Sequence, residues 1–104
     1  MHLESAMSGS QISSADLDVR RRRALFRASH RGMREMDLIM GRFADAEIVG
    51  LTEIELAQFE ALLDVPDQEA FSWFTGEVKP PQDHDTDLLR KVLAFQVRSV
   101  AAGF

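Results

Sequence analysis

Apolar side chains recur along most of the 104-residue chain at the three- and four-residue spacings of an α-helix. Residues 33–46 show this most clearly, with four apolar positions at i, i+3, i+4 and i+7. Strand-like alternation and internal repeats are absent from the sequence. The pattern predicts an all-α chain. The expected inward positions are Met36, Ile39, Met40 and Phe43, then Leu56, Phe59, Leu62 and Leu63, then Leu88, Leu89, Val92, Phe95, Gln96 and Ser99.

The first predicted helix covers residues 16–31 and contains neither proline nor glycine. Asp16 or Asp18 is suited to cap its start, and Gly32 is suited to end it, because glycine tolerates the positive φ that follows a helix. Four positions are expected to share one face of this helix, with Leu25 beside them: Val19, Arg22, Phe26 and Ser29.

The remaining helices have recognisable boundaries. The segment Thr52 to Glu55 has the sequence of a capping box, which predicts a helix start at that point. Asp67 is a candidate cap for a short aromatic helix that ends near Gly76. The segment 79–82 contains two prolines and predicts an extended linker, because proline cannot donate a helical hydrogen bond. A last helix is expected to begin between residues 83 and 87 and to end near residue 102.

The boundaries together predict a single domain, a compact five-helix bundle over residues 16–102. Residues 1–15 are small, polar and aperiodic, and are expected to form a disordered N-terminal tail without the features of a secretory or mitochondrial leader. No apolar run is long enough to predict a membrane span. Because the chain has no cysteine, disulfides and thiolate metal sites are excluded, which fits a reducing compartment such as the cytoplasm.

The charges are unevenly distributed. The net charge is −5, yet seven of the 12 basic residues are arginines within positions 20–34. Residues 35–87 hold fourteen acids and only two basic residues. Such asymmetry is typical of a surface that orients a partner. Four of the arginines follow at spacings of three, four and four, and should share a helical face: Arg20, Arg23, Arg27 and Arg31.

The corner between the first two helices displays a guanidinium beside a carboxylate. Arg31 ends the first helix, and with Gly32 as the cap of the second, Glu35 falls at its third position. One interpretation is structural: the two residues cap their helices and pair with each other, which contributes about 0–1 kcal/mol at a surface. The arginine face likewise has a structural interpretation, as a solvated face whose alkyl stems cover the core. The other interpretation is a binding site.

The segment Arg31 to Asp37, RGMREMD, follows an arginine-rich helix and resembles the succinate dehydrogenase assembly factors that promote flavinylation. Arg31, Gly32 and Glu35 match the R-G-x-x-E pattern of that family. The likeness continues through residues 51–63 and through a W-x-x-G element at residues 73–76, and it covers about residues 17–97.

The resemblance implies a bacterial, cytoplasmic helper protein rather than an enzyme. Family members bind the flavoprotein subunit of succinate dehydrogenase, with the fumarate reductase flavoprotein as a related client, and promote covalent attachment of FAD to it. FAD then belongs to the client, and no stable cofactor, catalytic residue, metal, nucleic acid or membrane insertion is expected for this chain. The residues that this implies for client binding are Arg27, His30, Arg31, Gly32, Met33, Arg34, Glu35 and Asp37.

Alternative functions remain at this point. A nucleic-acid-binding regulator could use the arginine-rich first helix, but the acidic composition of the rest of the chain argues against this function. An enzyme in its own right lacks any evident set of catalytic residues. The aromatic cluster around Trp73 suggests a buried helix more than a flavin-stacking site. The acids at residues 83–87 suggest a helix start more than a metal site.

Overall fold

The computed structural model describes residues 17–101, with side chains through residue 98. Within that range the chain forms five α-helices, two short 3-10 helices and no strand, as predicted for an all-α bundle. The proposed tail over residues 1–15 lies outside the described residues, as does residue 102. The elements are α1 (Val19–Ser29), α2 (Arg34–Glu47), η2 (Ile48–Gly50), α3 (Glu53–Leu63), α4 (Asp67–Phe74), η3 (Gln82–His84) and α5 (Asp87–Ala101).

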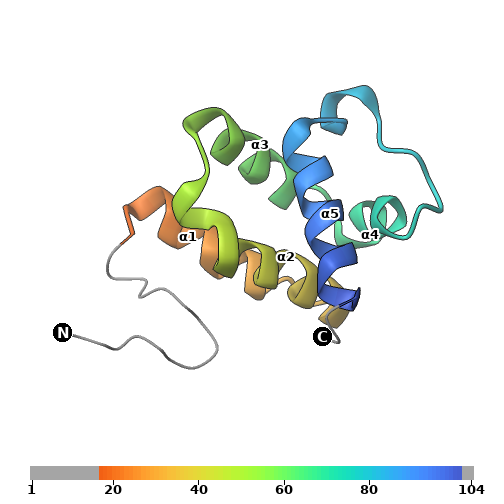
Figure 1. Ribbon diagram of the computed structural model, residues 1–104, viewed down its shortest axis with the longest axis horizontal. Helices are drawn as coiled ribbons and strands as arrows, with labels where there is room; N and C mark the ends of the chain where they lie inside the picture. Colours follow the sequence, from red (N-terminus) through yellow and green to blue (C-terminus); the bar gives the residue numbers. More distant parts are fainter. Residues whose placement is uncertain (1–16, 102–104) are drawn as a thin grey trace.

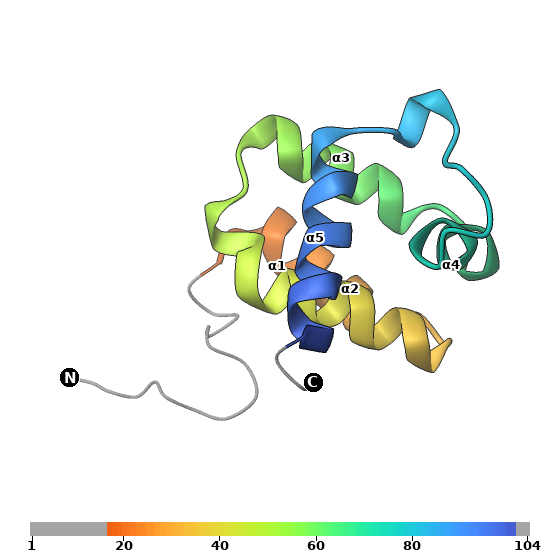
Figure 2. The same ribbon diagram turned by 45° about the vertical axis from the view of Figure 1, so that its right-hand side comes forward.

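Helices α1 and α2 form an antiparallel pair joined by a tight corner, and α5 crosses over α2 (Figures 1 and 2). Small residues let α1 and α2 approach closely. A Cβ added at Gly41 of α2 would lie 3.3 Å from both Cα and Cβ of Ser29, and the buried face of α1 consists of Ala24 and Ala28. Glycine and alanine therefore set the spacing of this pair.

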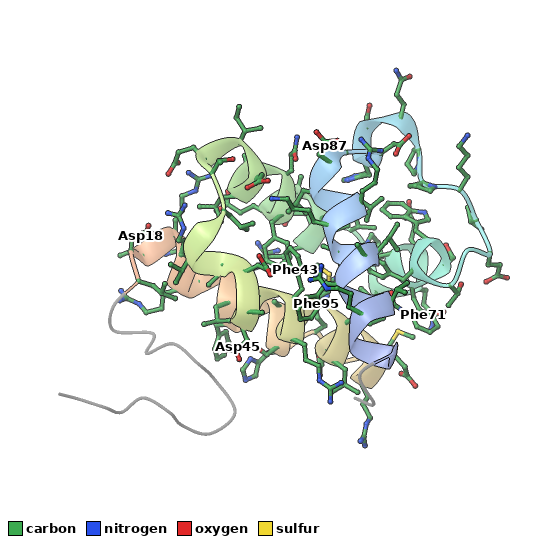
Figure 3. All side chains as sticks on the ribbon, in the orientation of Figure 1. Asp18, Phe43, Asp45, Phe71, Asp87 and Phe95 are labelled. Carbon is green, nitrogen blue, oxygen red and sulfur yellow. The ribbon has the colours of Figure 1, made fainter. Side chains whose placement is uncertain are left out.

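The core lies where α2, α3 and α5 meet. Phe43 is 1% exposed, and its ring centroid lies 5.6 Å from that of Phe59 and 5.8 Å from that of Phe95. Figure 3 shows Phe43 and Phe95 together beneath the crossing of α5 over α2. Most of the inward positions predicted for α2, α3 and α5 are buried, whereas Ser99 lies outside the described side chains.

Several predicted helix starts are confirmed. Asp18 caps α1 by accepting a hydrogen bond from the backbone N–H of Arg21. Thr52 and Glu55 form the complete capping box of α3. The proline-containing linker ends in η3, a single 3-10 turn that the sequence pattern did not predict.

The outward face of α1 differs from an ordinary amphipathic pattern. Val19 and Phe26 share a face, as expected, but that face points to solvent, with the two residues 57% and 62% exposed. The reason is that the close approach to α2 selects alanine side chains for the inner face, so the larger apolar residues of α1 remain outside.

Candidate functional site

The corner between α1 and α2 depends on Gly32. Its φ of +97° lies in the left-handed region, as the sequence predicted. That φ is incompatible with the extended conformation of an N-cap, so the prediction that Gly32 caps α2 is wrong. Met33 is the N-cap, and Glu35 therefore occupies the second helical position rather than the third. An Asp37 carboxylate oxygen accepts the backbone N–H of Arg31 and closes the corner.

Arg31 directs its guanidinium into the chain rather than toward solvent. Its side chain is 8% exposed, and its Nε lies 2.6 Å from a carboxylate oxygen of Asp67. The two terminal nitrogens donate to the backbone carbonyls of Leu63 and Val65, the latter at 2.6 Å. The predicted pair between Arg31 and Glu35 is absent among the described residues, and Asp67 takes the place of Glu35.

Two helix ends explain why this position suits a guanidinium. Leu63 is the last residue of α3, so its carbonyl is one of those that a helix leaves without an internal partner, and a cation there also meets the negative end of the helix dipole. Asp67 is the first residue of α4, where an anion meets the positive end. The prediction that Asp67 caps α4 is wrong, because Pro66 occupies the cap and Asp67 serves as the partner of Arg31.

The inner arginines of α1 continue this arrangement along α3. Arg27 lies 2.7 Å from an oxygen of Asp64, and Arg20 lies 2.7 Å from Glu60 and 2.9 Å from Glu53. The hydrogen bond from Arg20 lowers the pKa of Glu60 below its usual range. Most of the predicted arginine face is therefore neutralised within the chain.

Glu35 and its neighbour Arg34 are exposed at the first turn of α2. Within the part of the chain whose side chains are described, neither residue forms an ion pair or a side-chain hydrogen bond. These two side chains are thus available for a partner, and the backbone that carries them is fixed by Gly32, Asp37 and the buried Arg31.

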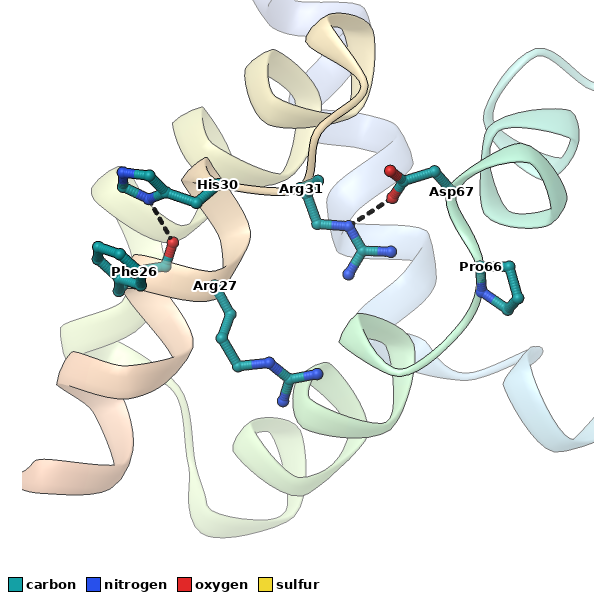
Figure 4. Close-up of a pocket in the computed structure, with 6 residues that line it drawn as sticks. All are labelled: Phe26, Arg27, His30, Arg31, Pro66 and Asp67. Atoms are coloured by element: carbon teal, nitrogen blue, oxygen red, sulfur yellow. Dashed lines mark hydrogen bonds and ion pairs between the residues drawn. The ribbon is translucent and has the colours of Figure 1, made fainter.

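Phe26 and His30 lie beside the corner on the solvent side of α1. Their rings stack, with centroids 3.9 Å apart and planes 15° from parallel. His30 Nδ1 lies 2.8 Å from the carbonyl oxygen of Phe26 and must donate there, because a carbonyl only accepts. In the view of Figure 4, both rings lie to the left of the α1 ribbon, and Asp67 lies to its right.

An open depression of about 370 Å³ separates the end of α1 from the start of α4 (Figure 4). It is shallow, and both of its walls carry charge. It therefore resembles part of a protein-binding surface more than an enclosed cofactor site. The lining residues are Phe26, Arg27, His30, Arg31, Pro66 and Asp67.

The structure brings the eight proposed client-binding residues to one end of the α1–α2 pair, with different exposures. Gly32, Arg34, Glu35 and His30 are exposed, whereas the remaining four are half-buried or nearly buried and are used within the chain. Those four are Arg27, Arg31, Met33 and Asp37.

The other sequence candidates have structural surroundings. Trp73 is 4% exposed and packs in the core, with the ring of His84 at 5.3 Å. Asp85 and Asp87 both pair with Arg90. Among the described residues, no three metal-ligating side chains lie close enough together to hold an ion. None of the described helices is both long and apolar enough to cross a membrane.

Comparison with known proteins now decides the family. The family described as "Flavinator of succinate dehydrogenase" matches residues 22–96, which is well over half of the chain and includes the corner, α3 and α4. The chain belongs to this family. The resemblance found in the R-G-x-x-E pattern is thereby confirmed.

Individual relatives agree with this assignment. The chain is 37% identical over 89 residues to the FAD assembly factor SdhE of Acetobacter pasteurianus, covering 86% of this chain and 82% of that protein. It is 33% identical over 78 residues to the mitochondrial succinate dehydrogenase assembly factor 2 of Dictyostelium discoideum. That match covers 75% of this chain and about half, 55%, of the mitochondrial protein. The comparison with solved structures gives no match.

Sequence reasoning missed the structural roles of two residues, Asp67 beside the corner and Arg21 at the opposite end of the α1–α2 pair. Asp67 had been assigned only to α4, because the spacing between residues 31 and 67 does not show that they meet. Arg21 had been treated as one of a charge run, yet it is 15% exposed and donates to the carbonyls of Ile48 and Leu51, at 3.0 and 2.5 Å. No local pattern distinguishes a buried arginine from an exposed one in a run of four.

Proposed function

We propose that this chain binds the flavoprotein subunit of succinate dehydrogenase and promotes covalent attachment of FAD to that subunit. Membership of the flavinator family supports the proposal, and so do the names of the relatives. The structural observation that carries it is Glu35, an exposed carboxylate without a partner among the described side chains, held on a rigid corner.

The proposed contribution of this chain is positioning rather than catalysis. FAD and the residue that it modifies belong to the flavoprotein, and attachment requires the two to be held in register. Orientation of bound groups can lower a barrier by several kcal/mol. A small bundle that docks through Glu35 and Arg34 stabilises one arrangement of the flavoprotein, and charge-assisted hydrogen bonds give that contact direction. The cytoplasmic location expected from the sequence stays a prediction.

The nucleic-acid alternative loses much of its basis in the structure. A recognition helix needs a continuous array of available cations. In this chain Arg20, Arg27 and Arg31 are instead paired with carboxylates of α3, of the α3–α4 connection and of α4, respectively. The function of a protein-binding assembly factor is favoured over that alternative.

The test is a reconstitution with purified apo-flavoprotein subunit, FAD and this chain. Covalent flavin is measured by its fluorescence on the denatured subunit over time. We expect the chain to accelerate attachment, and a parallel reaction with the fumarate reductase flavoprotein tests whether that subunit is also a client. Equal rates with and without the chain, for both subunits, would contradict the proposal.

A further inference from the structure

The solvent side of α1 presents an exposed surface of mixed chemistry. Its apolar members, Val19 and Phe26, are 57% and 62% exposed and lie two helical turns apart. Arg22 and Arg23 lie between them, and His30 follows one turn later. We call these five residues the outer α1 face. It ends at the corner that carries Glu35, so the two surfaces are continuous.

The charges of the outer α1 face differ from those of the inner face. Arginines on the inner side meet carboxylates of α3, of the α3–α4 connection and of α4, as described above. On the outer face, Arg23 makes no ion pair or side-chain hydrogen bond among the described side chains, and Arg22 reaches only the carbonyl of Leu17, at 3.4 Å. Within the described part of the chain, these two positive charges therefore have no carboxylate partner, although the net charge of the full sequence is −5.

The aromatic end of this face is pre-organised. The stack of Phe26 on His30, with its hydrogen bond from Nδ1 to the carbonyl of Phe26, restricts both rings before any partner arrives. A side chain that is already ordered loses less entropy on binding. Aromatic and arginine side chains are also the types enriched at protein–protein interfaces.

We infer that the outer α1 face is a second contact surface for the flavoprotein partner, and that it docks on an acidic surface with an apolar recess for Phe26. This inference rests on the proposed function. Charge complementarity selects an acidic partner, and continuity with the Glu35 corner places both contacts on one protein. A lipid bilayer fits less well, because the face offers only two apolar side chains and the acidic remainder of the molecule is repelled by anionic headgroups.

Two matched pairs of variants test the inference. Arg23→Glu is compared with Lys79→Glu, which makes the same charge change at an exposed lysine without an ion pair among the described residues. Phe26→Ser is compared with Val97→Ser, where the valine on α5 is 68% exposed. All four side chains are exposed, so melting temperatures should stay close to that of the unmodified chain. The measurement is the dissociation constant for the purified flavoprotein subunit at low and high salt.

We expect Arg23→Glu to weaken binding about tenfold at low salt and less at high salt, because salt screens exposed charges. Phe26→Ser should weaken binding at both salt concentrations, and the two control variants should bind like the unmodified chain. Equal affinities within each pair, while Glu35→Gln still weakens binding, would overturn the outer-face contact and leave the proposed function intact. An unmodified chain that neither binds the flavoprotein nor accelerates flavinylation would overturn both.

Vesicles containing phosphatidylglycerol provide the last arm of the test. We expect no binding of the chain to these vesicles at physiological salt. Vesicle binding that Arg23→Glu abolishes would reassign the outer α1 face to a membrane surface and overturn its assignment to the flavoprotein.

Discussion

Arg31 connects two parts of the chain that are thirty-six residues apart. Its guanidinium satisfies two carbonyls near the end of α3 and the carboxylate of Asp67, and its backbone N–H is held by Asp37. All of these groups are removed from bulk water to some degree, so the loss of one partner leaves the others unsatisfied. At the residue scale, Arg31 of the R-G-x-x-E pattern has a structural role, because it joins the end of α1 to the α3–α4 connection. Glu35 is the side chain of the pattern that is exposed to solvent.

The contacts of Arg31 predict that Arg31→Ala strongly destabilises the folded chain. Removing one partner from a buried ionic network costs about 3–5 kcal/mol, which lowers the melting temperature of a domain of this size by roughly 10 °C or more. Arg34→Ala is the matched control, since it removes an exposed arginine three residues away and should change stability by less than about 0.5 kcal/mol. Thermal unfolding followed by circular dichroism compares the two variants. Equal melting temperatures would contradict the structural role assigned to Arg31.

Gly32 predicts a backbone effect that is independent of contacts. An added Cβ meets nothing within 4 Å at Gly32 or at Gly50, but only Gly32 has a positive φ, +97°. Gly32→Ala should therefore destabilise the chain by about 1–2 kcal/mol, the cost of a left-handed conformation for an L-residue. Gly50→Ala should be neutral or slightly stabilising, because alanine reduces the entropy of the unfolded chain. Chemical denaturation of both variants measures the difference, and a Gly32→Ala protein as stable as Gly50→Ala contradicts the explanation.

At the scale of the elements, an ion pair joins the start of α3 to α5. Glu55 accepts from Lys91, and it also completes the capping box by accepting the N–H of Thr52. The hydrogen bond from Lys91, followed by the one from Thr52, lowers the pKa of Glu55. A carboxylate whose pKa is lower in the folded chain stabilises the fold above its unfolded pKa, and that stabilisation is lost as the pH falls through the folded pKa.

This linkage predicts a measurable pH dependence. Unfolding free energy should decrease as the pH falls below about 5, and Glu55→Gln should flatten that decrease because the amide does not titrate. Glu77→Gln is the control, since Glu77 is exposed and its side chain has no partner among the described residues. Urea unfolding at several pH values between about 3 and 7 compares the three proteins. Parallel curves for Glu55→Gln and the unmodified chain would refute the assigned role of Glu55.

Periodicity and capping signals were sufficient to predict the helices, because both are local. The capping box at Thr52, the helix break at Gly32 and the apolar stripe of α2 each depend on neighbours within one or two turns. The orientation of α1 was not predictable in the same way. Ala24 and Ala28 face inward only because Gly41 of α2 allows a close approach, and that information lies outside the helix itself.

The candidate site was predictable in position but not in the roles of its residues. The R-G-x-x-E pattern located the corner, and the corner indeed presents Glu35 to solvent. The partner of Arg31 depends on how α3 and α4 pack against α1, which no spacing in the sequence encodes. From the sequence alone, either Glu35 or Asp67 could pair with Arg31. Only the packing of the helices determines that Asp67 is the partner.

At the scale of the whole molecule, paired charges lie between the helices and unpaired charges lie on the outer α1 face and the corner, among the described residues. Arg20, Arg27 and Arg31 are paired with acids of α3, of the α3–α4 connection and of α4, whereas the outer α1 face and the corner present charge to solvent. The described residues offer a shallow charged depression near the corner, and the aromatic residues Trp73 and Phe74 are buried in the core. Such a surface suits a protein partner.

This organisation predicts weak or undetectable binding of free FAD. Quenching of flavin fluorescence during titration with the purified chain measures it directly. We expect little change with the chain alone, and a flavin signal that depends on the flavoprotein subunit when both proteins are present. Isolation of the chain with stoichiometric bound flavin would contradict the assignment of FAD to the partner.

The division of roles between Arg31 and Glu35 is tested most directly by measuring unfolding free energy and affinity for the flavoprotein subunit on the same two variants. Glu35→Gln should leave the melting temperature almost unchanged and weaken binding at least about tenfold, or 1.4 kcal/mol, because it removes a charge-assisted contact. Arg31→Ala should lower the stability of the free chain first, and affinity should fall only as far as the corner is disturbed. A Glu35→Gln protein that loses stability and binds with unchanged affinity would contradict the account.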